Sequence, residues 1–225
     1  MAKISPSVLA CDLSNLAAEV AEIEAAGADM VHLDVMDGVF VTNMSFGMPI
    51  IESLRKKSKM VFDVHLMIVH PEKYAERFID AGADILTFHY EACDKPAELL
   101  DLIRSRGVRS AISIKPTTSP EAIYPLLEKC DMVLVMTVEP GYGGQSFMPD
   151  MLPKIKAIRE EATRRGLDLD IQVDGGITPD NLKYATEAGA NVVVAGSAIF
   201  KAEKPEEVIA EMNRQAERYP FGAGV

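Results

Sequence analysis

Residues 31–38 read VHLDVMDG and place a histidine and two aspartates among apolar residues. On a β-strand successive side chains point to opposite faces, so His32, Asp34 and Met36 share one face and aliphatic residues fill the other. A strand with one wholly aliphatic face is typical of a parallel sheet packed under helices. A buried imidazole and carboxylate cost free energy unless they are paired or bind a metal. The segment therefore indicates a site of chemistry.

The same alternation brings out polar residues on two further predicted strands. In residues 61–67 the apolar positions alternate with Asp63 and His65, and in residues 169–174 the inward face includes Asp174. These side chains fall at or near the carboxyl ends of their strands. Since the carboxyl ends of parallel strands meet at one edge, we expect them to converge.

Two histidines and two carboxylates at one edge form a candidate site for one divalent metal ion, made of His32, Asp34, His65 and Asp174. Imidazole and carboxylate ligands suit zinc, iron, manganese or cobalt better than magnesium or calcium. Taken singly, an inward histidine is often a hydrogen-bonded core residue and a strand-end aspartate often caps a loop; four together favour the metal. We interpret Asp63 as a partner that orients a ligand, and Asp37 as a residue that caps the loop after its strand.

The elements that must position these residues alternate regularly along the chain. Strand patterns cover residues 4–9, 31–38, 61–67, 84–89, 108–114, 132–136, 169–174 and 192–195. Helical patterns cover residues 13–26, 50–57, 71–81, 96–106, 119–129, 151–166, 178–189 and 205–218. Strict alternation implies a parallel sheet, and eight units predict a closed (β/α)₈ TIM barrel, one α/β domain spanning residues 1–225. The alternative is an open doubly wound sheet, but no GxGxxG follows the first strand.

Glycines after the last two strands predict a phosphate site. Gly175 and Gly176 follow the seventh strand, and Gly196 and Ser197 follow the eighth, which are the usual phosphate-binding positions of such barrels. Glycine lets backbone N–H groups approach an anion, and a helix expected to start at Thr178 adds its dipole. Plain tight turns are the alternative.

The loop of residues 139–149 exceeds the roughly two to six residues usual for such connections. Its glycines, Gly141, Gly143 and Gly144, favour a lid that closes over substrate, the alternative being a flexible surface loop. Three methionines, Met36, Met67 and Met136, end strands at the same side. They form either an apolar collar around the site or ordinary core packing.

Composition excludes several classes of protein. Hydrophobic residues at 48% and charged residues at 25% are ordinary globular values. The net charge of −11 argues against nucleic-acid and anionic-membrane partners, so an anionic substrate needs local binding devices. Cys11, Cys93 and Cys130 form no CxxC pair, and the sequence shows neither an export leader nor a long apolar run. We therefore expect a cytoplasmic protein without a membrane span.

The chain resembles the ribulose-phosphate 3-epimerase family in seven segments that run in order from the first predicted strand to the last: SPSVLACDL, HLDVMDG, FVTNMSFG, DVHLM, VMTVEPGYGGQSF, VDGGI and GSAIF. The resemblance implies a (β/α)₈ barrel of the ribulose-phosphate-binding type that holds one divalent metal ion and forms a homo-oligomer, such as a dimer or hexamer. It also implies an isomerase of the pentose phosphate pathway, which epimerises C3 of D-ribulose 5-phosphate to D-xylulose 5-phosphate through an enediolate and two aspartates.

Position by position, the resemblance makes Asp34 and Asp174 the catalytic acid and base, and these two with His32 and His65 the metal ligands. It assigns contact with a phosphosugar substrate to Ser7, His65, Gly141, Tyr142, Gly143, Gly144, Asp174, Gly175, Gly176, Gly196 and Ser197. It also identifies Met36, Met67 and Met136 with the family's apolar collar.

The chain departs from the family pattern after the second strand. The family usually reads MDGHFVPN, and here Val39 and Thr42 replace the histidine and the proline, which alters the loop but not the metal set. Allulose-6-phosphate 3-epimerases share most of these motifs and are the alternative function. A phosphosugar lyase is less favoured, because its Asp-x-Lys-x-x-Asp motif lacks the lysine here. A non-catalytic phosphosugar-binding barrel is the remaining alternative.

Overall fold

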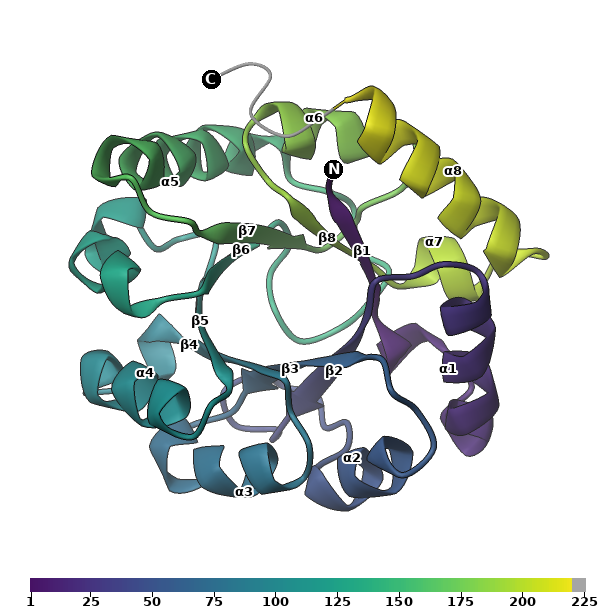
Figure 1. Ribbon diagram of the computed structural model, residues 1–225, viewed down its shortest axis with the longest axis horizontal. Coiled ribbons are helices and arrows are strands. Elements are labelled where there is room, and N and C mark those ends of the chain that lie inside the picture. The colour runs from purple at the N-terminus through teal and green to yellow at the C-terminus, as the bar shows by residue number, and fades with distance from the viewer. Residues whose placement is uncertain (220–225) are drawn as a thin grey trace.

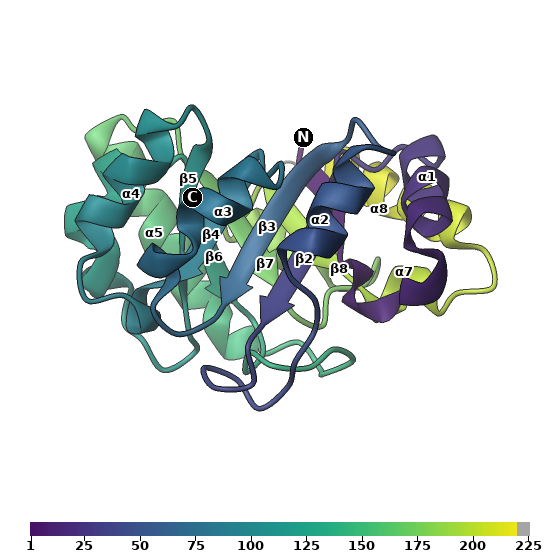
Figure 2. The same ribbon diagram turned by 90° about the horizontal axis from the view of Figure 1, so that it is seen from below.

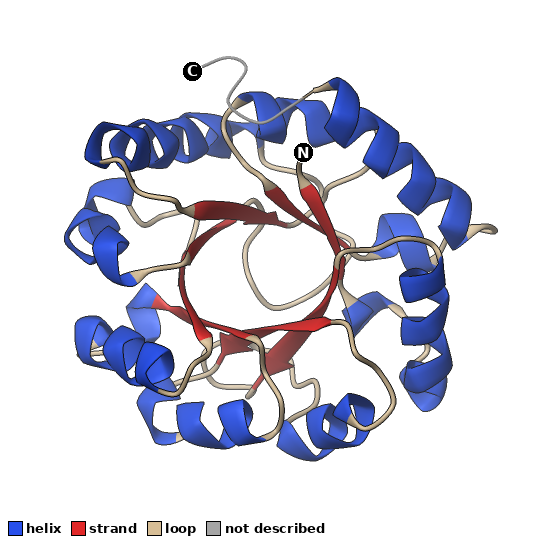
Figure 3. Ribbon diagram, viewed as in Figure 1, coloured by secondary structure: helices blue, strands red, loops and turns tan. Residues whose placement is uncertain are grey.

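The computed structural model describes residues 1–219, which form eight parallel strands curved into a barrel with helices outside (Figure 1, Figure 3). The strands are β1 Lys3–Pro6, β2 Met30–Met36, β3 Val61–Met67, β4 Ile85–His89, β5 Arg109–Ile114, β6 Met132–Met136, β7 Asp170–Asp174 and β8 Val192–Ala195. The α-helices are α1 Leu16–Ala25, α2 Met48–Arg55, α3 Ala75–Asp80, α4 Pro96–Ser105, α5 Leu152–Arg165, α6 Leu182–Glu187, α7 Ser197–Phe200 and α8 Pro205–Arg218. Short 3₁₀ helices are Val8–Ala10, Leu13–Asn15, Pro71–Lys73, Tyr90–Ala92 and Pro149–Met151.

Backbone hydrogen bonds join the strands in the order β1-β8-β7-β6-β5-β4-β3-β2. At the remaining junction, β1 meets β2 through one isolated parallel bridge between Ser7 and His32. The predicted (β/α)₈ barrel is therefore confirmed. In residues 1–219, no helix is at once long enough and apolar enough to cross a bilayer.

Alternation along the strands separates two kinds of surface. Aliphatic residues such as Leu33, Val64 and Val135 face the helices and are fully buried. Inside the barrel, an apolar layer at the amino-terminal ends consists of Met30, Ile85, Ala111, Met132 and Val192. Closer to the carboxyl ends the interior becomes polar, since the β2–β3 register pairs His32 with Asp63 and Asp34 with His65.

The first strand is shorter than predicted. It ends at Pro6, because the Oγ of Ser7 accepts a hydrogen bond from the backbone N–H of Leu9 and starts the 3₁₀ helix Val8–Ala10. The side chain of Ser7 thus lies at a turn beside β2.

Four predicted helices also differ from expectation. Those predicted at residues 13–26 and 71–81 begin with the 3₁₀ turns Leu13–Asn15 and Pro71–Lys73, and their α-helical parts are only α1 and α3. The segment Pro120–Lys129 is a 3₁₀ helix, because Pro125 in its interior has no N–H to donate and its ring would crowd the preceding α-helical turn. The helix expected at Thr178 begins only at Leu182. The reason is Asn181, whose Oδ1 accepts from the N–H of Thr178 and whose Nδ2 donates to the carbonyl of Gly176, which holds the intervening residues as a turn.

Figure 2 shows the barrel from the side, with the arrowheads of β2 and β3 pointing to one edge from which long loops project. In Figure 1, the loop that follows β6 crosses the barrel opening. This loop touches the one after β2, since a Cβ built on Gly141 lies 3.3 Å from Cβ of Val41. The loops after β2 and β6 therefore lie close together at the carboxyl ends of the strands.

Asp37 fixes the start of the loop after β2, as predicted. Its Oδ1 accepts the backbone N–H groups of Val39 and Phe40, each at 2.8 Å, and its Oδ2 accepts that of Val69 at 2.8 Å. Burial by itself would raise the pKa of Asp37, but these N–H groups lower it.

We expect Asp37→Asn to cost about 1–2 kcal/mol of unfolding free energy, because a neutral amide accepts these bonds less strongly. Since the folded pKa is lowered, the carboxylate stabilises above the unfolded pKa of about 3.9 and loses this effect as pH falls through the folded pKa. Urea unfolding should therefore separate the variant from the wild type at pH 7, and the difference should shrink as the pH is lowered below about 3.9. Equal midpoints at pH 7 would contradict this role.

Candidate active site

The carboxyl ends of β2, β3 and β7 bring four predicted residues together at one point. Nε2 of His32 lies 3.4 Å from Nδ1 of His65, and Oδ1 of Asp34 lies 3.3 Å and 3.2 Å from these two nitrogens. Oδ2 of Asp174 lies 3.8 Å from the His32 nitrogen and 3.6 Å from the His65 nitrogen. One ligand atom from each residue thus lies within 4.8 Å of all the others.

These spacings fit a single divalent metal ion. Ligand atoms about 2.0–2.2 Å from a tetrahedral metal are separated from one another by roughly 3.3–3.6 Å. The five distances between the nitrogen and oxygen atoms above run from 3.2 to 3.8 Å. Two imidazoles and two carboxylates are a donor set that zinc, iron, manganese and cobalt accept, and the carboxylates balance a double positive charge.

Asp63 orients His32 for such a role. Its Oδ2 lies 2.7 Å from Nδ1 of His32 and also accepts hydrogen bonds from Ser5 Oγ and Gln172 Nε2. Because this carboxylate oxygen accepts from Nδ1 of His32, the other ring nitrogen, Nε2, is the one that faces the cluster and would bind a metal. The predicted support of a ligand by Asp63 is thus visible as a contact.

Asp34 and Asp174 bind their protons with very different strength. Although burial favours the protonated form of Asp34, the charges and hydrogen bonds of His32 and His65 lower its pKa well below the usual range. Burial and the charge of Asp34 raise the pKa of Asp174 to about 6. The pKa of His32 lies well above its usual value, because Asp63 and Asp34 outweigh the effect of burial. Ser7 Oγ donates to Asp34 Oδ2 at 2.5 Å and directs Oδ1 at the histidines.

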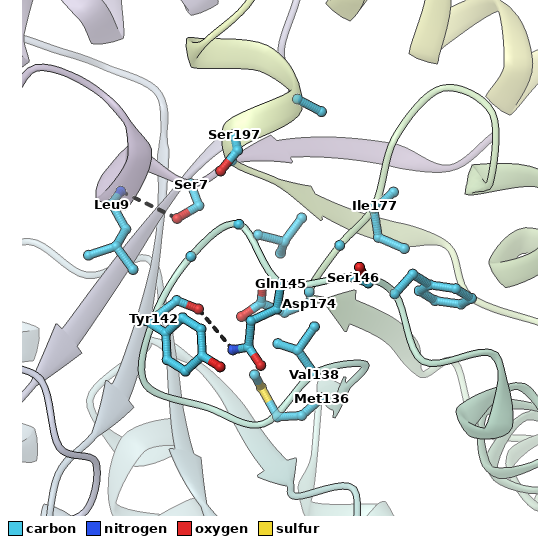
Figure 4. A pocket seen from close by; sticks show the side chains of 18 of the residues that line it. Ser7, Leu9, Met136, Val138, Tyr142, Gln145, Ser146, Asp174, Ile177 and Ser197 are labelled. Atoms are coloured by element: carbon cyan, nitrogen blue, oxygen red, sulfur yellow. Dashed lines mark hydrogen bonds between the residues drawn. The ribbon is translucent and has the colours of Figure 1, made fainter.

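A cavity of about 950 Å³ opens next to the cluster. Asp34 and Asp174 both line this cavity. It is also lined by nine other residues that were predicted to contact substrate: Ser7, Gly141, Tyr142, Gly143, Gly144, Gly175, Gly176, Gly196 and Ser197. Met36, Met67 and Met136 line it as well, the first two packed with Val41 and the third with Leu134 and Val138. His32 and His65 are fully buried and do not line the cavity. Figure 4 shows side chains from several loops around this space.

The loop of residues 139–149 is cross-linked by Gln145, which the sequence reading missed. Its Nε2 donates to the carbonyls of Glu139 at 2.6 Å and Tyr142 at 3.0 Å, the second bond being drawn in Figure 4. A Cβ built on Gly144 lies 3.6 Å from Oγ of Ser197, so the loop reaches across to the end of β8. The glycines mark this loop in the sequence, whereas the two hydrogen bonds donated by Gln145 are visible only in the folded structure.

The turn after β7 packs tightly against the end of this loop. Gly176 has φ of +70°, and a Cβ there would lie 2.2 Å from the backbone nitrogen of Phe147. Thr137 holds the same turn by donating its N–H to the carbonyl of Asp174 and its Oγ1 to the carbonyl of Gly175. Only glycine fits at position 176.

Two further features escaped prediction. The four-residue helix α7, Ser197–Phe200, starts directly after β8, and a short extra helix here is common at the phosphate sites of such barrels. His89 points into the barrel from β4, with its Nε2 2.9 Å from Nε2 of His65, and burial lowers its pKa to about 4. The alternation of Leu86 and Phe88 with Thr87 and His89 could have revealed it.

Comparison with sequence families gives a match over residues 3–200 to the model described as the ribulose-phosphate 3 epimerase family. The ribulose-phosphate 3-epimerase of Eremothecium gossypii is 48% identical over 220 residues, covering 93% of this chain and 90% of the relative. The ribulose-phosphate 3-epimerase of Oryza sativa subsp. japonica, cytoplasmic isoform, is 46% identical and covers 96% of this chain and 95% of the relative.

Solved structures show the same barrel at low identity. KGPDC from Streptococcus mutans has a TM-score of 0.75 at 14% identity, covering 98% of this chain and 99% of its own. The 3-hexulose-6-phosphate synthase of Salmonella typhimurium has a TM-score of 0.74 at 18% identity, covering 96% and 99%. These similarities concern the fold alone.

Proposed function

The chain belongs to the ribulose-phosphate 3-epimerase family, and we propose that it is an isomerase that converts D-ribulose 5-phosphate to D-xylulose 5-phosphate by inverting C3. The observation that carries this proposal is the pair of carboxyl groups, Asp34 and Asp174, that meet beside one cavity from strands on different sides of the barrel. Inversion requires a proton to leave one face of a carbon and another to arrive at the opposite face. Two acid/base groups at one cavity are suited to that reaction.

We assign the metal site to His32, Asp34, His65 and Asp174, whose spacing fits one ion of zinc, iron, manganese or cobalt. When bound, such an ion supplies Lewis-acid stabilisation of the negative charge that develops on the C2 and C3 oxygens.

The two aspartates move the protons. One removes the C3 proton and leaves a 2,3-enediolate, and the other delivers a proton to the opposite face. Ser7 holds Asp34 in place through the 2.5 Å hydrogen bond to Oδ2, and Thr137 holds the backbone of Asp174. Because the Asp34 carboxylate and the backbone of Asp174 are both held by neighbours, the two acid/base groups start from defined positions.

The other end of the substrate is assigned to the turns after β7 and β8. Gly175, Gly176, Gly196 and Ser197 line the cavity there, so their backbone groups and the Ser197 hydroxyl can bind phosphate without a basic surface. The loop of residues 139–149 excludes water when it closes over the substrate, and Gln145 keeps its shape. Met36, Met67 and Met136 form the apolar wall near the reacting carbons.

The direct experiment is an epimerisation assay of the purified protein with D-ribulose 5-phosphate and with D-allulose 6-phosphate, alongside exchange of the C3 proton with deuterated water. We expect the pentulose phosphate to have the higher kcat/KM. A higher value for the hexulose phosphate would transfer the assignment to the sister activity. Binding of both sugars without turnover by metal-loaded protein would exclude both epimerase assignments and favour a non-catalytic phosphosugar-binding barrel.

We expect Gly176→Ala to raise KM for the phosphosugar roughly tenfold or more. A Cβ at this left-handed position costs about 1–2 kcal/mol and displaces the backbone at Phe147. Gly47→Ala is the matched control, since a Cβ there meets nothing within 4 Å and Gly47 has an extended backbone. Steady-state kinetics of both variants test the assignment, and an unchanged KM for Gly176→Ala would contradict it.

We also propose a homo-oligomer that works in the cytoplasm. The three cysteines are free thiols, as expected in a reducing compartment, and the rice relative is named as a cytoplasmic isoform. Light scattering of the purified protein would give the number of subunits.

A further inference from the structure

His65 uses both of its ring nitrogens inside the barrel. Nδ1 faces the cluster, 3.2 Å from Oδ1 of Asp34, and Nε2 lies 2.9 Å from Nε2 of His89. The two ring planes are nearly parallel, with 26° between them, and both side chains are fully buried. Among the described residues, the polar partners of His89 are His65 and Glu91 and not Asp34 or Asp174, so His89 lies outside the four-residue candidate metal site.

The proton positions on the two rings are coupled through this contact. A neutral imidazole carries one proton and one lone pair, and two facing nitrogens need one of each. If Nδ1 of His65 offers its lone pair to the cluster, its Nε2 carries the proton and donates to His89. Nε2 of His89 must then accept, which puts the proton of His89 on Nδ1.

Glu91 is placed to stabilise that arrangement. Its Oε2 lies 3.4 Å from Nδ1 of His89, a long contact, and that nitrogen has no closer partner among the described residues. Its Oε1 is already taken by the N–H of Lys115 at 2.8 Å and by the hydroxyl of Thr118. Glu91 therefore has one oxygen anchored and one oxygen facing Nδ1 of His89, where it can accept a hydrogen bond from that nitrogen.

The surroundings keep His89 in position. The ring of Phe40 lies 4.7 Å from the ring of His89, and Nζ of Lys115 lies 3.9 Å from the centre of the Phe40 ring. Phe40 belongs to the loop after β2, which Asp37 fixes at its start. The ring of His89 is thus packed against an aromatic side chain.

We propose that His89 and Glu91 are positioning residues that hold His65 in the tautomer whose Nδ1 lone pair faces the metal site. This inference rests on the proposed metal dependence. It gives each histidine of the cluster a support that ends in a carboxylate: Asp63 directly for His32, and Glu91 through His89 for His65. Partners of this kind typically change metal affinity by about 10- to 100-fold.

The decisive variant is Glu91→Gln, which keeps size and shape. The oxygen of the new amide must stay with Lys115 and Thr118, so its NH₂ group faces Nδ1 of His89. His89 then has to accept at Nδ1 and carry its proton on Nε2, where it meets the proton of His65. Glu98→Gln removes an equal charge from an exposed side chain of α4 and is the control.

The measurement is cobalt(II) binding to the full-length protein without substrate, by chelator competition and visible absorption. We expect Glu91→Gln to weaken cobalt binding about 10- to 100-fold and to alter the spectrum, and Glu98→Gln to do neither. His89→Leu should weaken binding similarly, and His89→Gln, whose side-chain oxygen can accept from His65, should recover part of the loss.

Three outcomes would overturn the inference. The first is a Glu91→Gln variant whose cobalt affinity lies within twofold of that of the control and whose spectrum is unchanged. The second is equal binding by His89→Leu and His89→Gln in protein that circular dichroism shows to be folded. The third is a wild-type protein that does not bind cobalt, which would also refute the proposed metal dependence. If the wild type binds cobalt and Glu91→Gln binds it equally well, only the positioning role is refuted.

Discussion

Replacing Asp174 by asparagine is expected to lower kcat for epimerisation roughly 10³-fold, because an amide of the same size neither takes nor delivers the C3 proton. Asp34→Asn should have a comparable effect. Asp174 is placed for this role by the carboxyl end of β7, with its Oδ2 within 4 Å of both cluster histidines. The expected loss is in kcat rather than KM, since the phosphate-binding turns remain intact.

The measurement combines turnover with exchange of the C3 proton in deuterated water, started separately from each epimer. With one aspartate gone, the other can still exchange the proton of the epimer that presents its hydrogen to that side. The two variants should therefore favour opposite epimers in exchange. Asp168→Asn, at the opposite end of the barrel beside Lys3 and Arg109, is the control for loss of one carboxylate. Normal turnover by either metal-saturated variant would refute the two-aspartate assignment.

Removing divalent metal with a chelator is expected to lower kcat/KM at least about 10²-fold, since Lewis-acid stabilisation is worth several kcal/mol. Stability should fall as well, because a ligand that binds only the folded state at 100 times its Kd adds about 2.7 kcal/mol. For a chain of this size that corresponds to roughly 5–10 °C in Tm.

Elemental analysis before and after chelation, together with kinetics and thermal melts, tests this expectation. Zinc, cobalt, manganese or iron should restore both activity and Tm, whereas magnesium should restore little, because two of the four ligands are imidazole nitrogens. Full turnover by protein shown to be free of metal would contradict the assignment of the cluster.

The convergence of the four-residue cluster followed from simple rules. Period-two alternation places His32, Asp34, His65 and Asp174 on inward faces, and parallel strands carry their carboxyl ends to the same edge. Neither rule requires knowledge of distant contacts. The fold was equally accessible, because eight helical segments alternate with eight apolar ones and most are ended by glycine or started by proline.

Features that depend on side chains meeting across the chain were not accessible in this way. Asn181 hydrogen-bonds to the backbone of Thr178 and Gly176, so the helix starts after it rather than at Thr178. Local side-chain bonds of this kind compete with those that cap a helix, and the sequence alone does not distinguish the two. Gln145 becomes a clamp only once the loop is folded around it. His89 was within reach of the alternation rule, but its meaning appears only when its ring meets that of His65.

β1 meets β2 through a single isolated bridge between Ser7 and His32, so the side chains of the candidate site help to close the barrel at this junction. All other neighbouring strands are joined by continuous hydrogen-bond ladders, so we expect local unfolding of the barrel to begin at the β1–β2 junction. Ser7 on the β1 side hydrogen-bonds to Asp34 of β2, and Ser5 of β1 hydrogen-bonds to Asp63 of β3, so side chains in and beside the candidate site also join the two sides of this junction. Occupancy of the site should therefore slow amide hydrogen exchange along β1 and β2.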